Sequence, residues 1–170
     1  DVDNALGTAV TASTLTTAMG GTILFEQSGG GAVSFGTVST TTDGSAADGE
    51  DDITLRNTGG DLTVTTSVTA DGAGDILLNT VTSGNVILTG TTTAAGDQVT
   101  ITSAGAINGA GLVTGSTIDL NAVSGIGDST ALELAGSTLT IDSDSGNVDV
   151  DNTLGTAVTA STLTTAMGGT

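Results

Sequence analysis

The sequence predicts an all-β protein built as a parallel β-helix, or β-solenoid, with about seven coils in each 148-residue repeat. Three observations carry this prediction: a long duplication, short strand-like segments that return at regular intervals, and a composition suited to a thin core. Only two of the 170 residues are aromatic, Phe25 and Phe35, while Gly accounts for 27 and Pro is absent. Proline would remove a donor from a central strand, so its absence suits a chain built from stacked strands.

The duplication links the two ends of the sequence. Residues 149–170 repeat residues 1–22 with one difference, Thr153 in place of Ala5. An identity of this length indicates tandem repetition. We therefore interpret residues 1–148 as one period and residues 149–170 as the start of the next, and we expect the natural chain to extend further.

The strand-like segments are triplets with an apolar residue at each end, separated by Gly, Asn, Asp and Ser in turns. One set comprises Ile53–Leu55, Ile76–Leu78, Val99–Ile101, Ile118–Leu120 and Leu132–Leu134, and the other comprises Leu62–Val64, Val86–Leu88, Leu139–Ile141 and Val148–Val150. The first four members of the first set begin 23, 23 and 19 residues apart, which fits one coil each. Seven coils at about 4.8 Å each give about 34 Å of axis per period.

Two local features qualify this pattern. The stretch Ser28–Asp52 fits it worst, and we expect a loop there that leaves the coil. Asn57, Asn79 and Asn121 each follow a triplet closely. They are candidates for an amide ladder along the axis, and the alternative is ordinary turn asparagine.

The segment AGAINGAGLVTGSTIDLNAVSGIG (residues 104–127) resembles the repeats of giant bacterial surface proteins of the filamentous-haemagglutinin and autotransporter-passenger kind. The resemblance is strongest over Asp51–Asn152 and weaker over Ile23–Glu50. It implies a secreted, elongated, right-handed β-helix displayed at the cell surface. The near-exact long repeat departs from a single-passenger adhesin and favours a repetitive fibre or stalk.

Charge and composition exclude several classes of function. The net charge is −18 and Arg56 is the only basic residue, which argues against partners such as nucleic acid or anionic lipid. No apolar run is long enough to insert into a membrane. Because His, Lys and Cys are absent, the familiar nucleophilic and thiolate sites cannot be built, and we expect no enzyme activity.

Two clusters of polar residues are candidate sites. Asp48, Glu50, Asp51 and Asp52 form an acidic run that could bind Ca²⁺, which prefers hard oxygen ligands, and the alternative is a solvated loop. Threonine runs at 40–42, 63–65 and 91–93 could order ice-like water, but only if T-x-T recurs at one coil position in successive coils. The alternative is threonine acting as an ordinary strand former on a wet face.

The sequence as a whole predicts a structural segment of an extracellular tandem-repeat β-solenoid that forms a surface fibre, sheath or stalk. Its expected partner is itself, through stacking of repeat on repeat and lateral bundling of fibres. The alternative is an adhesin that contacts a cell or a surface through exposed loops such as Ser28–Asp52.

Overall fold

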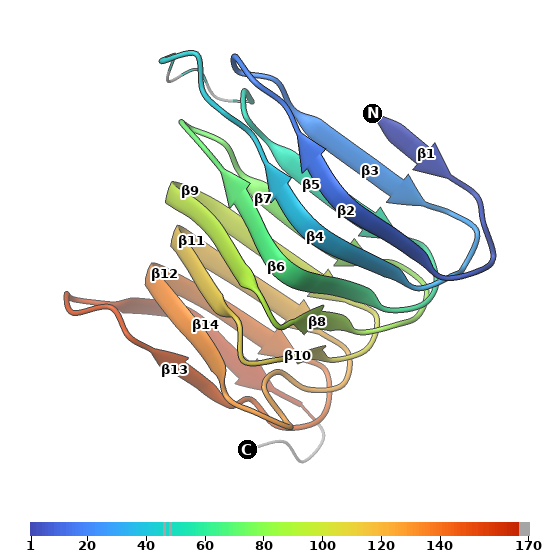
Figure 1. The fold of residues 1–170 in the computed structure, drawn as a ribbon. Coiled ribbons are helices and arrows are strands. Elements are labelled where there is room, and N and C mark those ends of the chain that lie inside the picture. The colour runs from blue at the N-terminus through green and yellow to red at the C-terminus, as the bar shows by residue number, and fades with distance from the viewer. Residues whose placement is uncertain (46, 48, 167–170) are drawn as a thin grey trace.

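The computed structural model describes residues 1–45, 47 and 49–166, and these residues form one parallel β-solenoid without helices (Figure 1). The strands are β1 (Val2–Asn4), β2 (Val10–Thr16), β3 (Ile23–Gln27), β4 (Val33–Ser39), β5 (Ile53–Asn57), β6 (Leu62–Ala70), β7 (Ile76–Thr80), β8 (Val86–Leu88), β9 (Thr91–Ser103), β10 (Ile107–Asn108), β11 (Leu112–Ala122), β12 (Leu132–Ser143), β13 (Val150–Asn152) and β14 (Thr159–Thr165). The described part of the chain has no helix that could cross a membrane.

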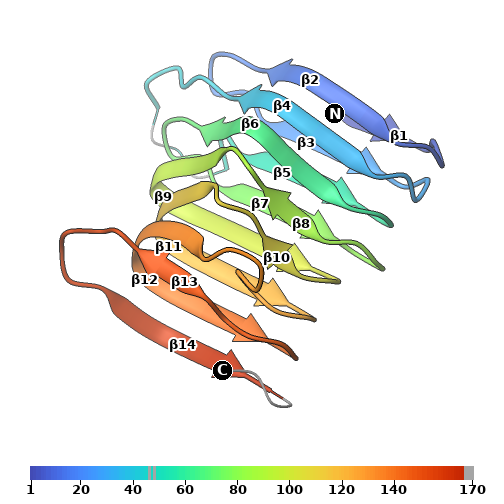
Figure 2. The same cartoon turned by 60° about the horizontal axis from the view of Figure 1, so that its bottom comes forward.

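Each turn of the solenoid contributes to three faces, which we call A, B and C in chain order. Face A stacks β1, β3, β5, β7, the C-terminal parts of β9, β11 and β12, and β14. Face B stacks the N-terminal parts of β2, β4 and β6 with β8 and β10. Face C stacks the C-terminal parts of β2, β4 and β6, the N-terminal parts of β9, β11 and β12, and β13. Figure 2 shows these strands lying side by side, stacked along the axis.

Period-two alternation places the apolar residues of each strand in the interior. On face A, the parallel register aligns two columns of buried side chains along the axis. The first column is Ile23, Ile53, Ile76, Val99, Ile118 and Leu139, and the second is Phe25, Leu55, Leu78, Ile101, Leu120 and Ile141. The predicted all-β parallel solenoid of about seven turns is confirmed.

One grouping of the predicted triplets is wrong. Leu132–Leu134 lies on face C, where β12 pairs with β13, and it is Leu139–Ile141 that continues the face A columns. The two triplets belong to one long strand that passes from face C to face A. Their apolar patterns are alike, so composition alone cannot assign them to faces.

The expected loop in Ser28–Asp52 is shorter than predicted, because β4 lies inside this stretch and pairs with both β2 and β6. Of the described residues, only 40–45, 47 and 49–52 leave the coil, between faces C and A, and we call them the loop 40–52. Both aromatic side chains precede this segment in the sequence and lie in the core. Phe25 and Phe35 pack edge to face with ring centroids 5.0 Å apart in the N-terminal part of the interior.

The duplicated segments occupy different faces of the solenoid. In the first copy, β1 lies on face A and β2 on faces B and C. In the second copy, the equivalent residues form β13 on face C and β14 on face A. An advance of 148 residues therefore corresponds to six turns and two further faces rather than to seven whole turns.

Apolar side chains remain uncovered at both ends of the stack. Val2 and Leu6 in the first turn are 41% and 57% exposed, and Val158 and Leu163 in the last turn are 41% and 62% exposed. Elsewhere the inward residues are covered by the turns above and below. Burial of one such side chain is worth about 1.5–3 kcal/mol.

Candidate functional site

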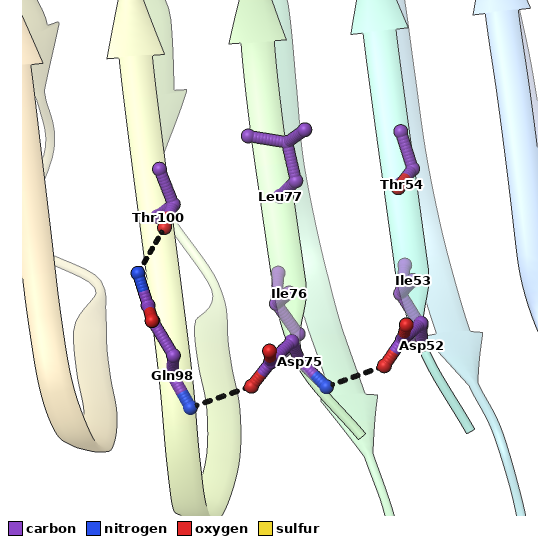
Figure 3. Close-up of a pocket in the computed structure, with 8 residues that line it drawn as sticks. All are labelled: Asp52, Ile53, Thr54, Asp75, Ile76, Leu77, Gln98 and Thr100. Atoms are coloured by element: carbon purple, nitrogen blue, oxygen red, sulfur yellow. Dashed lines mark hydrogen bonds between the residues drawn. The ribbon is translucent and has the colours of Figure 1, made fainter. Parts of the chain in front are cut away.

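A ladder of polar side chains runs along the corner at which face A begins (Figure 3). The backbone N–H of Asp75 donates to Oδ1 of Asp52 over 2.9 Å, and the backbone N–H of Gln98 donates to Oδ1 of Asp75 over 2.9 Å. The Gln98 side chain turns along its own strand, where Nε2 donates to Oγ1 of Thr100 over 2.9 Å. Each acceptor side chain thus satisfies a backbone donor of the following turn.

The corner at which face B begins has the same construction. Asn85 donates its backbone N–H to Oδ1 of Asp61, and Ala106 donates to Oδ1 of Asn85, both over 2.8 Å. Sequence reasoning missed both ladders. A signal was available, because an Asp or Asn stands directly before the first apolar residue of β5, β6, β7 and β8.

The ladder at face A forms one wall of a shallow surface depression. Its floor is Thr54, Leu77 and Thr100, from three successive turns. The two carboxylates in the wall can accept further hydrogen bonds from a polar ligand. The one basic residue, Arg56, lies on the same face, where its Nη1 forms a 2.9 Å ion pair with Oε1 of Glu26.

A column of buried polar residues ends the face A strands. Asn57 is fully buried, and its Nδ2 donates to the carbonyl oxygens of Gly31, Gly60 and Asp61 over 3.0–3.1 Å. Other members of the column also donate to carbonyl oxygens of nearby turns: Gln27 to Leu6, Thr80 to Gly84, Ser103 to Ala106 and Ser143 to Ser145. These side chains hold the corner between faces A and B from inside.

The predicted asparagine ladder is wrong. Asn57 belongs to the interior column, whereas Asn79 and Asn121 point outward. Thr102 separates the latter two along the axis, so no two of the three asparagines stack on each other. The error has a simple cause: one residue of offset after a triplet moves a side chain from the outer surface to the interior.

The acidic run points in several directions. Asp48 lies outside the described residues. Asp52 faces outward in the corner ladder. The Glu50 side chain lies instead beside Gly20, where its Oε2 is 3.6 Å from the position that a Cβ would take. Asp51 is buried, and neither of its carboxylate oxygens has a hydrogen-bond partner. In the described part of the chain, no three Asp, Glu, His or Cys side chains come together as a metal-binding group.

The structure aligns hydroxyl groups on the outer surface of face C. One row contains Thr14, Thr37, Ser67 and Thr91, and the next contains Thr16, Ser39, Thr69, Thr93 and Thr114. The condition of T-x-T at one coil position in successive turns is not met strictly, because Ser39 and Ser67 replace threonine in the two middle turns. A pair of hydroxyl residues two positions apart does recur over four successive turns. Of the threonine runs noted in the sequence, only 91–93 belongs to these rows.

The class of protein is a parallel β-solenoid. Its three faces of stacked parallel strands, its core one coil wide and its hydrogen-bonded corners define this class. Comparison with protein-family models, with curated proteins and with solved structures finds no match to this chain.

Proposed function

We propose that this chain is a structural segment of an extracellular tandem-repeat β-solenoid protein, of the filamentous-haemagglutinin or autotransporter-passenger kind. In this proposal, successive repeats stack into a fibre, sheath or stalk at the cell surface, and the role is mechanical rather than catalytic. The observation that carries the proposal is the pairing of the duplicated segment on both of its sides. As β1 and β2 it pairs with the following turn, and as β13 and β14 it pairs with the preceding turn.

The exposed ends of the stack support repeat-on-repeat packing. A further period would cover Val158 and Leu163 as the second turn covers the first, and would pair the free edges of β13 and β14. Unpaired edges otherwise favour aggregation. Because each period advances six turns and two faces, each new period would begin one face short of a whole number of turns.

Stiffness would come from the hydrogen bonds that join each turn to the next. All strand pairs in the described residues are parallel and lie across the axis, so axial extension would break them together. The corner ladders add side-chain hydrogen bonds in the same direction.

Chains of one, two and three periods test this proposal by small-angle scattering. Six turns and two faces per period, at about 4.8 Å per turn, predict that each added period lengthens a rod of constant cross-section by about 32 Å. Periods that fold as separate beads on a flexible chain would contradict the proposal, because the cross-section and the length increment would then vary with linker conformation.

The hydroxyl rows of face C favour a second candidate function, adhesion to a flat hydrogen-bonding surface such as ice. Neighbouring hydroxyls are spaced about 4.8 Å along the axis and about 6.7 Å along a strand, two residues apart. Residues 43–45 of the loop 40–52 are exposed and offer another contact, as an adhesin would require.

Adsorption of fluorescently labelled protein to growing ice tests this second candidate. Thr69→Tyr, in the middle of the rows, should lower adsorption by about tenfold. Thr63→Tyr, which lies outward on face B of the same strand, is the matched control and should leave adsorption unchanged. Equal adsorption of both variants and the parent, or none by the parent, would eliminate this function.

A further inference from the structure

We propose that Asp51 anchors a binding site for one Ca²⁺ ion between the loop 40–52 and the turn that follows β6. The site is narrower than the acidic run expected from the sequence, and it does not depend on the proposed fibre. Its ligands would be the Asp51 carboxylate, the Thr42 hydroxyl and the Asp71 carboxylate, completed by water. Calcium accepts six to eight such oxygen ligands.

The state of Asp51 is the first step of the argument. The residue is 1% exposed, its φ is +61°, and both carboxylate oxygens lack a hydrogen-bond partner. Its backbone is fixed, because the Thr40 hydroxyl donates to its carbonyl oxygen over 2.9 Å. A buried carboxylate with neither a donor nor a counter-ion costs several kcal/mol.

The surroundings of Asp51 supply further oxygen atoms. A Cβ built on Gly72 would lie 2.7 Å from Oδ2 of Asp51 and 2.9 Å from Oγ1 of Thr42, so both oxygens border the same small space. Asp71 holds this arrangement together, because its Oδ2 accepts the backbone N–H of Thr42 over 3.4 Å and its Oδ1 accepts that of Gly72 over 2.9 Å. Only glycine fits at position 72, where φ is +64°.

The protein itself provides no positive charge for this site. Arg56 is the only basic residue of the sequence, and it is paired with Glu26 on face A. A cation that neutralises this site would therefore come from solution. Ca²⁺ fits better than Mg²⁺, because Mg²⁺ requires a nearly ideal octahedron and gives up its water reluctantly.

The expected affinity is low. Two carboxylates contribute, and no third acidic side chain in the described residues completes a metal-binding group with them. Sites of extracellular modules with few charged ligands have dissociation constants of about 10⁻⁴–10⁻³ M. A bound ion would tie the loop to the turn between β6 and β7, and so fix the one long excursion from the coil among the described residues.

Calcium titration of the whole chain by isothermal calorimetry tests the site, with Asp51→Asn as the main variant. The parent should bind one ion saturably, and Asp51→Asn should weaken binding by about tenfold or more. Asp128→Asn is the matched control, since it removes the same charge from an exposed residue far along the chain. Its affinity should equal that of the parent.

Thermal unfolding gives a second readout that distinguishes a specific site from diffuse counter-ions. In the presence of a chelator, Asp51→Asn should melt at a higher temperature than the parent, because the substitution removes an unpaired buried charge. Calcium should raise the melting temperature of the parent but not that of the variant. If Asp51→Asn does not fold, Thr42→Val should weaken calcium binding in its place. Non-saturable binding, or equal loss of affinity in Asp51→Asn and Asp128→Asn, would overturn the proposal.

Discussion

At the residue scale, Asn57 illustrates how a polar side chain is accommodated inside a narrow apolar core. Its Nδ2 donates to the carbonyl oxygens of Gly31, Gly60 and Asp61, and so joins the turn between β5 and β6 to the neighbouring turn of the solenoid. Asn79, one turn further on, follows its strand core by one residue and points outward. Two asparagines of similar sequence context therefore have different structural roles.

Replacing Asn57 by Ala should lower the free energy of unfolding by about 3 kcal/mol, because buried carbonyl oxygens lose their donor and a cavity forms. Urea unfolding measures the change. Asn79→Ala is the control and should cost less than about 1 kcal/mol, because this side chain lies on the outer surface. Similar losses in the two variants would contradict the interior role of Asn57.

At the element scale, the strands could be predicted from the sequence but their placement on faces could not. Apolar residues at alternate positions in Thr- and Val-rich segments were sufficient to locate Ile53–Leu55, Ile76–Leu78 and Val99–Ile101 as stacked strands. The face on which a later strand lies depends on how many residues each corner consumes. Leu132–Leu134 and Leu139–Ile141 have the same pattern, and only the turn length decides between face C and face A.

The candidate sites show the same limit. The acidic run was visible in the sequence, but the different directions of Glu50, Asp51 and Asp52 follow from backbone geometry, including the positive φ of Asp51. The hydroxyl rows of face C required a register between turns whose lengths differ. Alternation fixes which side of a strand a residue faces, but it does not fix its neighbours in the next turn.

Close approach between turns makes Gly109 much harder to replace than Gly96. A Cβ on Gly109 would lie 2.0 Å from the carbonyl oxygen of Leu88, whereas a Cβ on Gly96 would meet nothing within 4 Å, although both residues have positive φ. Gly109→Ala should therefore cost about 3 kcal/mol or more, and Gly96→Ala about 1–2 kcal/mol from backbone strain alone. Urea unfolding of both variants checks this order, and the reverse order would show that the turns are not packed as described.

At the scale of the whole molecule, charge and symmetry govern how solenoids meet one another. A net charge of −18 on each 170-residue chain, with a single basic residue, makes neighbouring rods repel. End-to-end stacking within one chain is unaffected, because it depends on backbone pairing and apolar burial. Side-by-side bundling is therefore the step that solution conditions control.

Sodium chloride should promote lateral association of multi-period chains. Raising the ionic strength from about 0.01 M to about 1 M shortens the Debye length from about 30 Å to about 3 Å, which screens the repulsion between rods. Sedimentation velocity in the presence of a chelator should show larger species at high salt. Association that is unchanged or reduced by salt would mean that rods meet through attractive charge pairs instead.

The near-identical segments at the two ends fit the solenoid in two settings, β1 with β2 and β13 with β14. The physical reason is that both places in the solenoid accept a strand of alternating small apolar and hydroxyl residues. A continuous array would then be a screw, in which each period advances six turns and two faces.

Electron cryo-microscopy of a multi-period array tests the continuous solenoid most directly. The structure predicts an axial layer line near 4.8 Å and a period of about 32 Å, with each period rotated by about one third of a turn relative to the last. Globular beads without the 4.8 Å axial spacing would contradict a continuous solenoid. A period of about 34 Å without rotation would retain the solenoid but show that the two copies share one face in the array.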